Sequence, residues 1–185
     1  DAAMNAAENN TAVGYAALGA LTEGDQNVAI GRNAGLLLTT GENNVLVGDG
    51  PGATLAAAMS NNVLVGRNAG TAINHADANG TVAIGHVALT ALTSGSENTA
   101  IGYQALLGHV GGDKCTAIGY QAMYDTDAAT VQSSDNNLAI GYRAMSGTWA
   151  NNKSEGNTAI GNLAMAGAMD DAATNIAIGQ AALTA

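Results

Sequence analysis

The chain is poor in cysteine, aromatic residues and positive charge, and it has no long apolar run. Its 185 residues include one cysteine, one tryptophan and no phenylalanine. A single cysteine, Cys115, excludes an intrachain disulfide. No segment approaches the ~18 consecutive apolar residues of a transmembrane helix, so we expect no membrane insertion. Five lysines and arginines against fifteen aspartates and glutamates give a net charge of −10, which disfavours binding to nucleic acid or anionic lipid.

The sequence offers no arrangement typical of a catalytic site. Glycoside hydrolysis needs two carboxylates that face each other across the substrate, whereas Asp170 and Asp171 are neighbours in the chain. Cys115 has no histidine beside it in the repeat pattern, so we interpret it as a small polar substitute rather than a nucleophile. We therefore predict that the protein is not an enzyme.

Metal binding has little support in the sequence. His75, His86 and His109 show no ligand spacing, and the Gly-Gly-x-Gly-x-Asp nonapeptide of calcium-binding rolls is absent. Carboxylates recur just before the predicted strands, where we expect a solvated acidic edge; they are Glu8, Asp25, Glu42, Glu97, Asp135 and Glu155. We predict no cofactor, with Ca²⁺ bound by Asp125, Asp127 and Asp135 as the alternative.

What the chain does have is one short phrase in ten copies: Asn, Thr or Val, Ala, Ile or Val, then Gly. A period of 17 to 22 residues predicts a stacked solenoid in which each copy is one coil. We expect a single repeat array over residues 1–185, continued beyond both ends because the terminal residues read as partial units. The marker glycines are Gly14, Gly31, Gly48, Gly66, Gly85, Gly102, Gly119, Gly141, Gly161 and Gly179.

Each phrase is short, β-branched and alternating, which is the pattern of a strand. Its last residue before the glycine is always β-branched and aliphatic, so we predict that this column is the core: Val13, Ile30, Val47, Val65, Ile84, Ile101, Ile118, Ile140, Ile160 and Ile178. The preceding residue is mostly Ala, which allows another backbone to approach closely. After the glycine, a recurrent Ala–Leu or Ala–Met pair predicts a second short strand, with a short helix as the alternative.

These patterns predict an all-β fold, a parallel β-roll or β-solenoid of about ten coils with two or three short strands in each. The residue that opens each phrase is Asn in eight copies. Coils stacked about 4.8 Å apart bring identical amides within hydrogen-bonding reach, so we predict a structural amide ladder rather than a ligand site. Its members are Asn10, Asn27, Asn44, Asn62, Asn98, Asn137, Asn157 and Asn175.

Two features are candidate binding sites. Tyr103, Tyr120 and Tyr142 follow the marker glycines of three consecutive copies, and we expect them to stack into an aromatic strip. The strip predicts contact with sugar rings, with a purely stabilising tyrosine ladder as the alternative. Trp149 lies in one of the two longest return segments, and insertions of this kind often carry the binding face of a repeat array. We predict an exposed contact residue at Trp149, with local packing as the alternative.

The repeat also carries a family resemblance. Residues 98–106 read Asn-Thr-Ala-Ile-Gly-Tyr-Gln-Ala-Leu, and residues 116–123 nearly repeat this phrase. It resembles the repeat arrays of phage tail-fibre proteins and related bacterial surface proteins, and is similar to the Asn/Ser-Val-Ala-Ile-Gly repeats in the heads of trimeric autotransporter adhesins. The resemblance implies a left-handed parallel β-roll that assembles as a homotrimer. The units here are longer and more variable than in the adhesin heads.

Together these observations predict a structural or adhesive segment of an extracellular fibre, on a cell surface or a virion. Its partners are expected to be other copies of the chain and a glycan or receptor on a host surface. The alternative is a subunit of a surface filament that stacks end to end. Ice binding would need a flat threonine array, and we interpret Thr11, Thr99, Thr116 and Thr158 as core-facing residues interrupted by aliphatic ones.

Overall fold

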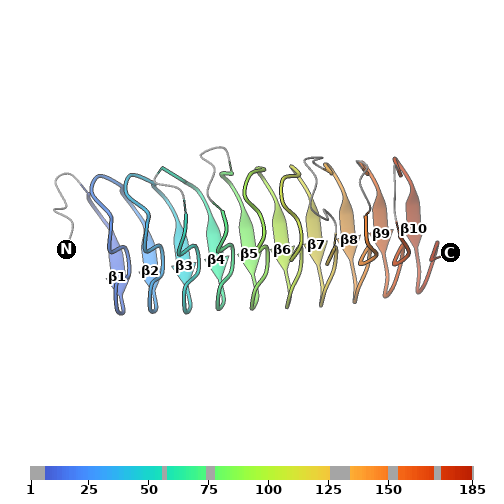
Figure 1. Ribbon diagram of the computed structural model, residues 1–185, viewed down its shortest axis with the longest axis horizontal. Coiled ribbons are helices and arrows are strands. Elements are labelled where there is room, and N and C mark those ends of the chain that lie inside the picture. Colours follow the sequence, from blue (N-terminus) through green and yellow to red (C-terminus); the bar gives the residue numbers. More distant parts are fainter. Residues whose placement is uncertain are drawn as a thin grey trace.

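The computed structural model describes residues 7–55, 58–73, 78–125, 134–149, 154–168 and 172–184. The chain winds into an elongated β-solenoid, with the first and last strands at opposite ends of its long axis (Figure 1). Each copy of the repeat contributes one strand of three residues. The strands are β1 (Thr11–Val13), β2 (Val28–Ile30), β3 (Val45–Val47), β4 (Val63–Val65), β5 (Val82–Ile84), β6 (Thr99–Ile101), β7 (Thr116–Ile118), β8 (Leu138–Ile140), β9 (Thr158–Ile160) and β10 (Ile176–Ile178).

All ten strands form a single parallel sheet in chain order, and its register aligns the repeats residue by residue. Thr99, for instance, pairs with Thr116, and Ile101 pairs with Ile118. Because neighbouring strands lie about 4.8 Å apart, every position of the repeat becomes a column along the axis. The predicted all-β parallel solenoid is confirmed, and no helix occurs in the described ranges.

The marker glycines end the strands. Their φ angles lie between +122° and +143°, a region that residues with a Cβ rarely adopt. The coils also approach each other closely at this column. A Cβ added to Gly141 would lie 2.6 Å from the carbonyl oxygen of Gly161 in the next coil. Both the bend and the stacking of coils therefore require glycine.

Each coil contains one strand in the described residues, so the prediction of two or three is wrong. After the glycine the chain turns tightly, and the second and fourth residues adopt left-handed conformations. In the sixth copy these are Gln104 at φ 56° and Leu106 at φ 52°. The turn is held by hydrogen bonds within the coil and to the next one: Ala105 N–H donates to Gly102 O, and Leu106 N–H donates to Ala122 O. Repeated left-handed residues break the extended backbone that a second strand would need.

The core lies on the opposite side of the strands from the predicted one. The central residue of β2 to β9 is fully buried, whereas the first and third residues are partly or largely exposed. The column predicted as core is therefore on the outside: Val13, Ile30, Val47, Val65, Ile84, Ile101, Ile118, Ile140, Ile160 and Ile178. Ile30 is 41% exposed and Ile84 37%. The interior of a coil is narrow, so it accepts mostly alanine from the strand and larger side chains from the opposite wall.

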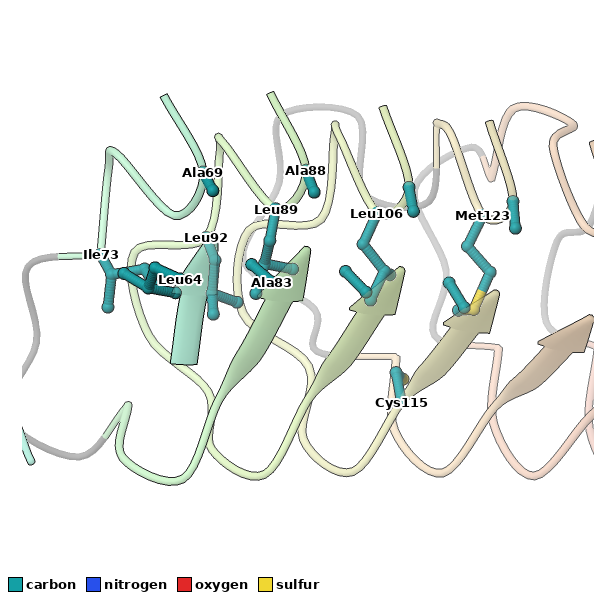
Figure 2. Packing of buried hydrophobic residues seen from close by; sticks show 14 of the residues in the cluster. Leu64, Ala69, Ile73, Ala83, Ala88, Leu89, Leu92, Leu106, Cys115 and Met123 are labelled. Atoms are coloured by element: carbon teal, nitrogen blue, oxygen red, sulfur yellow. The ribbon is translucent and has the colours of Figure 1, made fainter. Parts of the chain in front are cut away.

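That opposite wall supplies leucine and methionine. Leu89, Leu106 and Met123 are fully buried, and Figure 2 shows them reaching from the turns toward the strands. Two strands carry leucine instead of alanine at the centre, Leu46 and Leu64, and the turns facing them then carry glycine. Sequence positions on the two walls thus complement each other in volume, as close packing of a protein interior demands.

Candidate functional site

The outer side of the sheet forms one of two surfaces with functional potential, here called the aliphatic face. It consists of the first and third residues of all ten strands. The third residues are the exposed column named above. The first residues are Thr11, Val28, Val45, Val63, Val82, Thr99, Thr116, Leu138, Thr158 and Ile176. The threonines among them face outward, which corrects their interpretation as core-facing.

None of the side chains of the aliphatic face is charged. Nine strand intervals make it about 43 Å long, and its two columns lie about 6.6 Å apart, which gives an area of the order of 300 Å². That is the size of the largest apolar patch on a typical monomer, and such patches commonly mark interaction sites. The parallel register keeps the face regular from β1 to β10.

The second surface is the aromatic edge, the columns of the first and second residues after the marker glycines in copies four to eight. Tyr103, Tyr120 and Tyr142 stack here as expected. Their ring centroids lie 5.3 and 5.4 Å apart, and each interplanar angle is 12°. The ring of His86 lies at the end of the stack, tilted by 45° with its centroid 5.5 Å from that of Tyr103. Parallel strand spacing sets this periodicity, so the ladder is a consequence of the fold.

Stacking decides which parts of the rings a ligand meets. The three tyrosines are 40–46% exposed, whereas Tyr15, which stacks on no ring in the described residues, is 79% exposed. Neighbouring rings thus cover part of each other's faces. A sugar would meet ring edges and phenol hydroxyls along the ladder rather than open ring faces. Beside the rings, Gln121 Nε2 donates a hydrogen bond to Gln104 Oε1 at 2.7 Å. The two glutamine amides thus form a polar column next to the tyrosines.

Charged residues extend the same edge toward the N-terminus. Arg32 forms a bidentate ion pair with Asp49, in which both nitrogen–oxygen distances are 3.0 Å. The hydrogen bond from Arg32 holds the pKa of the Asp49 carboxyl below its ordinary value, and the positive charge of Arg67 adds a smaller effect in the same direction. Arg67 itself forms no ion pair with any described residue.

The amide column is hydrogen-bonded from coil to coil. Asn27 Oδ1 accepts hydrogen bonds from the backbone N–H and the Nδ2 of Asn44, at 3.0 and 2.9 Å. The Nδ2 of Asn27 in turn donates to the carbonyl of Gly41, which ties the strand to the return loop. These buried asparagines are structural and leave no group for a ligand.

Two residues interrupt this column. Cys115 is fully buried, and its thiol replaces the amide donor by bonding Ser134 O at 3.0 Å. Thr81 is also buried, but its Oγ1 has no hydrogen-bond partner. The column is therefore weakest at Thr81.

Trp149 does not have the exposed position expected of a contact residue. It is 2% exposed, so the alternative of local packing holds. Its backbone N–H donates to Asp125 O at 3.2 Å, which joins the two long return segments. Residues 126–133 and 150–153 of these segments lie outside the described residues. The length of an insertion did not reveal that its tryptophan folds back into the core.

The residues considered for Ca²⁺ have other contacts. Asp135 Oδ1 accepts from the backbone N–H of Asp113 at 3.0 Å, and Asp125 Oδ2 accepts from Thr148 Oγ1 at 3.1 Å. Asp127 lies outside the described residues. In the part of the chain that is described, no three His, Cys, Asp or Glu residues gather as a metal site would require. Three aspartates before the strands instead accept a hydrogen bond from a backbone N–H of the preceding coil: Asp25 from Glu8 at 2.6 Å, Asp113 from Ser96 at 2.7 Å and Asp135 from Asp113 at 3.0 Å.

Comparison with family models, with curated proteins and with solved structures finds no match in any of the three. Among the described residues, no helix has the length and apolar character required to cross a membrane. The two surfaces therefore have to be interpreted from their own chemistry.

Proposed function

We propose that this chain is a structural and adhesive segment of an extracellular fibre, built from three copies that pack through their aliphatic faces. The observation that carries the proposal is the aliphatic face itself. A monomer would hold twenty uncharged side chains of Thr, Val, Leu and Ile against water along its whole length. Covering them with another copy removes apolar surface from water, which stabilises the assembly by about 25 cal/mol per Å².

The size of the face sets limits on the assembly. A stable interface usually buries about 800 Å² on each partner, nearly three times the area of the aliphatic face. Columns beside the face must therefore contribute to the contact. A threefold arrangement lets each copy meet two neighbours around one axis, and the resemblance to trimeric adhesin heads and tail-fibre arrays supports three copies and a left-handed roll.

A stiff, elongated shape suits a shaft. In a solenoid each coil contacts only its neighbours, so length can grow without a larger core. The proposal assigns the chain no catalytic step and no cofactor. Presentation outside the cell or virion, with contact to a host-surface glycan or receptor, follows from the resemblance and from the exposed aromatic edge.

The test is the mass of the purified chain, measured by light scattering and native mass spectrometry, together with electron microscopy. We expect discrete rods with the mass of three copies. Ile84→Lys places a charge on the aliphatic face and should lower the mass to that of one copy. Leu37→Lys is the matched control, because Leu37 is 50% exposed but lies off the face. A wild-type monomer, or a trimer unchanged by Ile84→Lys, would refute the proposal.

A second variant tests the same face without the risk that an introduced charge unfolds the chain. Thr116→Val is nearly isosteric, keeps a β-branched residue in β7 and makes the face more apolar. We expect trimers to persist to lower protein concentrations than in the wild type. Long polymers in the microscope would instead favour the alternative of a surface filament that stacks end to end.

A further inference from the structure

All three arginines of the chain lie on one edge of the solenoid. Arg32 and Arg67 directly follow marker glycines, and Arg143 follows Tyr142. Arg32 is neutralised by Asp49, whereas the exposed Arg67 and Arg143 form no ion pair within the described residues. In a chain of net charge −10, the aromatic edge therefore has cationic groups at both ends, and the rest of the body repels anions.

The groups between these arginines are held in a fixed row. Hydrogen bonds between coils join the backbones, from Gln121 N–H to Tyr103 O and from Arg143 N–H to Tyr120 O, both at 2.9 Å. From Arg67 to Arg143 the row crosses four strand intervals, about 19 Å. Stacked aromatic rings lose little conformational entropy on binding because they are already ordered.

The chemistry of the row suits a ligand rich in hydroxyl and carboxylate groups. Phenol hydroxyls both donate and accept hydrogen bonds, and the glutamine amides beside them do the same. Arginine binds carboxylates through bidentate, charge-assisted hydrogen bonds. We infer that the edge from Arg67 to Arg143 binds an extended acidic polysaccharide, laid along the axis with about one sugar residue per coil.

This inference rests on the proposed adhesive function and names the class of ligand. A polysaccharide fits better than an acidic peptide, because Tyr103, Tyr120 and Tyr142 recur at the regular spacing of the coils. An acidic polysaccharide fits better than a neutral one, because Arg67 and Arg143 stand at the two ends of the aromatic edge.

The experiment is calorimetric titration of the full chain with a galacturonate pentamer. Its methyl ester is the neutral control, and a glutamate pentamer is the acidic peptide control. We expect the acid sugar to bind at least about tenfold more tightly than either control. Its affinity should fall as the salt concentration is raised. No binding of the acid sugar, equal binding of its ester, or equal binding of the peptide would each overturn the inference.

Variants locate the site. Arg67→Gln and Arg143→Gln should each lower the affinity about tenfold, the effect of losing one charge-assisted hydrogen bond. Replacing Tyr103, Tyr120 and Tyr142 by Phe keeps the stack, removes the hydroxyls and should lower the affinity similarly. Lys114→Gln removes the same charge from an exposed position in another column and should leave the affinity unchanged. Equal effects of the arginine and lysine variants would overturn the inference.

Light scattering of the same samples separates this inference from the proposed function. Trimers that fail to bind the sugar overturn the inference alone. Monomers that bind it support the inference and overturn the trimeric assembly alone.

Discussion

The complementary walls of the core can be tested by moving volume from one wall to the other. Leu64 at the centre of β4 is fully buried, and it faces Gly70 on the turn of the same coil. A Cβ added to Gly70 would lie 2.9 Å from Leu64 Cδ2 and 2.9 Å from Ile73 Cδ1. The fifth coil has the opposite arrangement, with Ala83 on the strand and Leu89 on the turn.

The magnitudes follow from this geometry. Leu64→Ala leaves a cavity and should cost about 3 kcal/mol of unfolding free energy. Gly70→Leu overpacks the same space and puts a left-handed φ of +59° on a branched residue; overpacking and backbone strain together should cost about 2–3 kcal/mol. The double variant recreates the arrangement of the fifth coil, so we expect it to cost only about 1–2 kcal/mol. The coupling between the two sites should reach at least about 3 kcal/mol.

The assay is urea unfolding at one protein concentration, because association would shift apparent stability. Circular dichroism reports on the whole sheet, and the buried Trp149 reports on its C-terminal part. Leu106→Ala combined with Gly70→Leu is the control, because the two residues lie two copies apart, and its effects should be additive. Additive effects of Leu64→Ala and Gly70→Leu would refute the argument that the two walls share one volume.

Three further outcomes are expected. Gly102→Ala should destabilise the chain by more than Gly179→Ala, because both glycines have a positive φ but only Gly102 has the next coil against it; equal changes in the urea midpoint would contradict this. Thr81→Asn should raise stability by about 1–2 kcal/mol by restoring the amide column, and Thr81→Val by less; a loss with Thr81→Asn would show that the column cannot accept an amide there. Cys115→Ala should cost about 1 kcal/mol through the lost bond to Ser134 O, measured in the same assay under reducing conditions.

Much of the fold could be predicted because the repeat fixes the register. Ten glycines at similar spacing place ten strands in one parallel sheet, and the register then brings Asn27 beside Asn44 and Tyr103 beside Tyr120. These contacts need only the strand positions and the spacing between coils. Handedness and the trimeric state stay predictions, because they depend on features outside the register.

The inward side of the strands could not be chosen by hydrophobicity alone, since both faces are apolar. β-branched side chains are typical of cores and also of any sheet surface that packs on a partner. One signal in the sequence did distinguish the faces. Leu46 and Leu64 replace alanine in copies three and four, and the turn position carries glycine in copies two, three and four: Gly35, Gly52 and Gly70.

Contacts across the core explain why three glycines accompany two leucines. A Cβ on Gly35 would lie 2.6 Å from Leu46 Cδ1 in the next coil, and one on Gly52 would lie 3.0 Å from Leu64 Cδ1. Each turn therefore packs against the strand centre of the following coil as well as its own. Such compensation between positions occurs only where side chains share a closed space, so it identifies the alanine column as the core.

The same reasoning links the error about the core to the function. If the alanine column fills the coil, then the Val and Ile column cannot also be inside a single chain. A sequence that keeps β-branched aliphatic residues at this outward position in all ten copies maintains them against the cost of exposure to water. A solubility requirement alone would favour polar residues there, as it does on the solvent face of other sheets. Packing of the aliphatic faces against one another supplies a physical reason for this pattern, and the mass of the Ile84→Lys variant tests it directly.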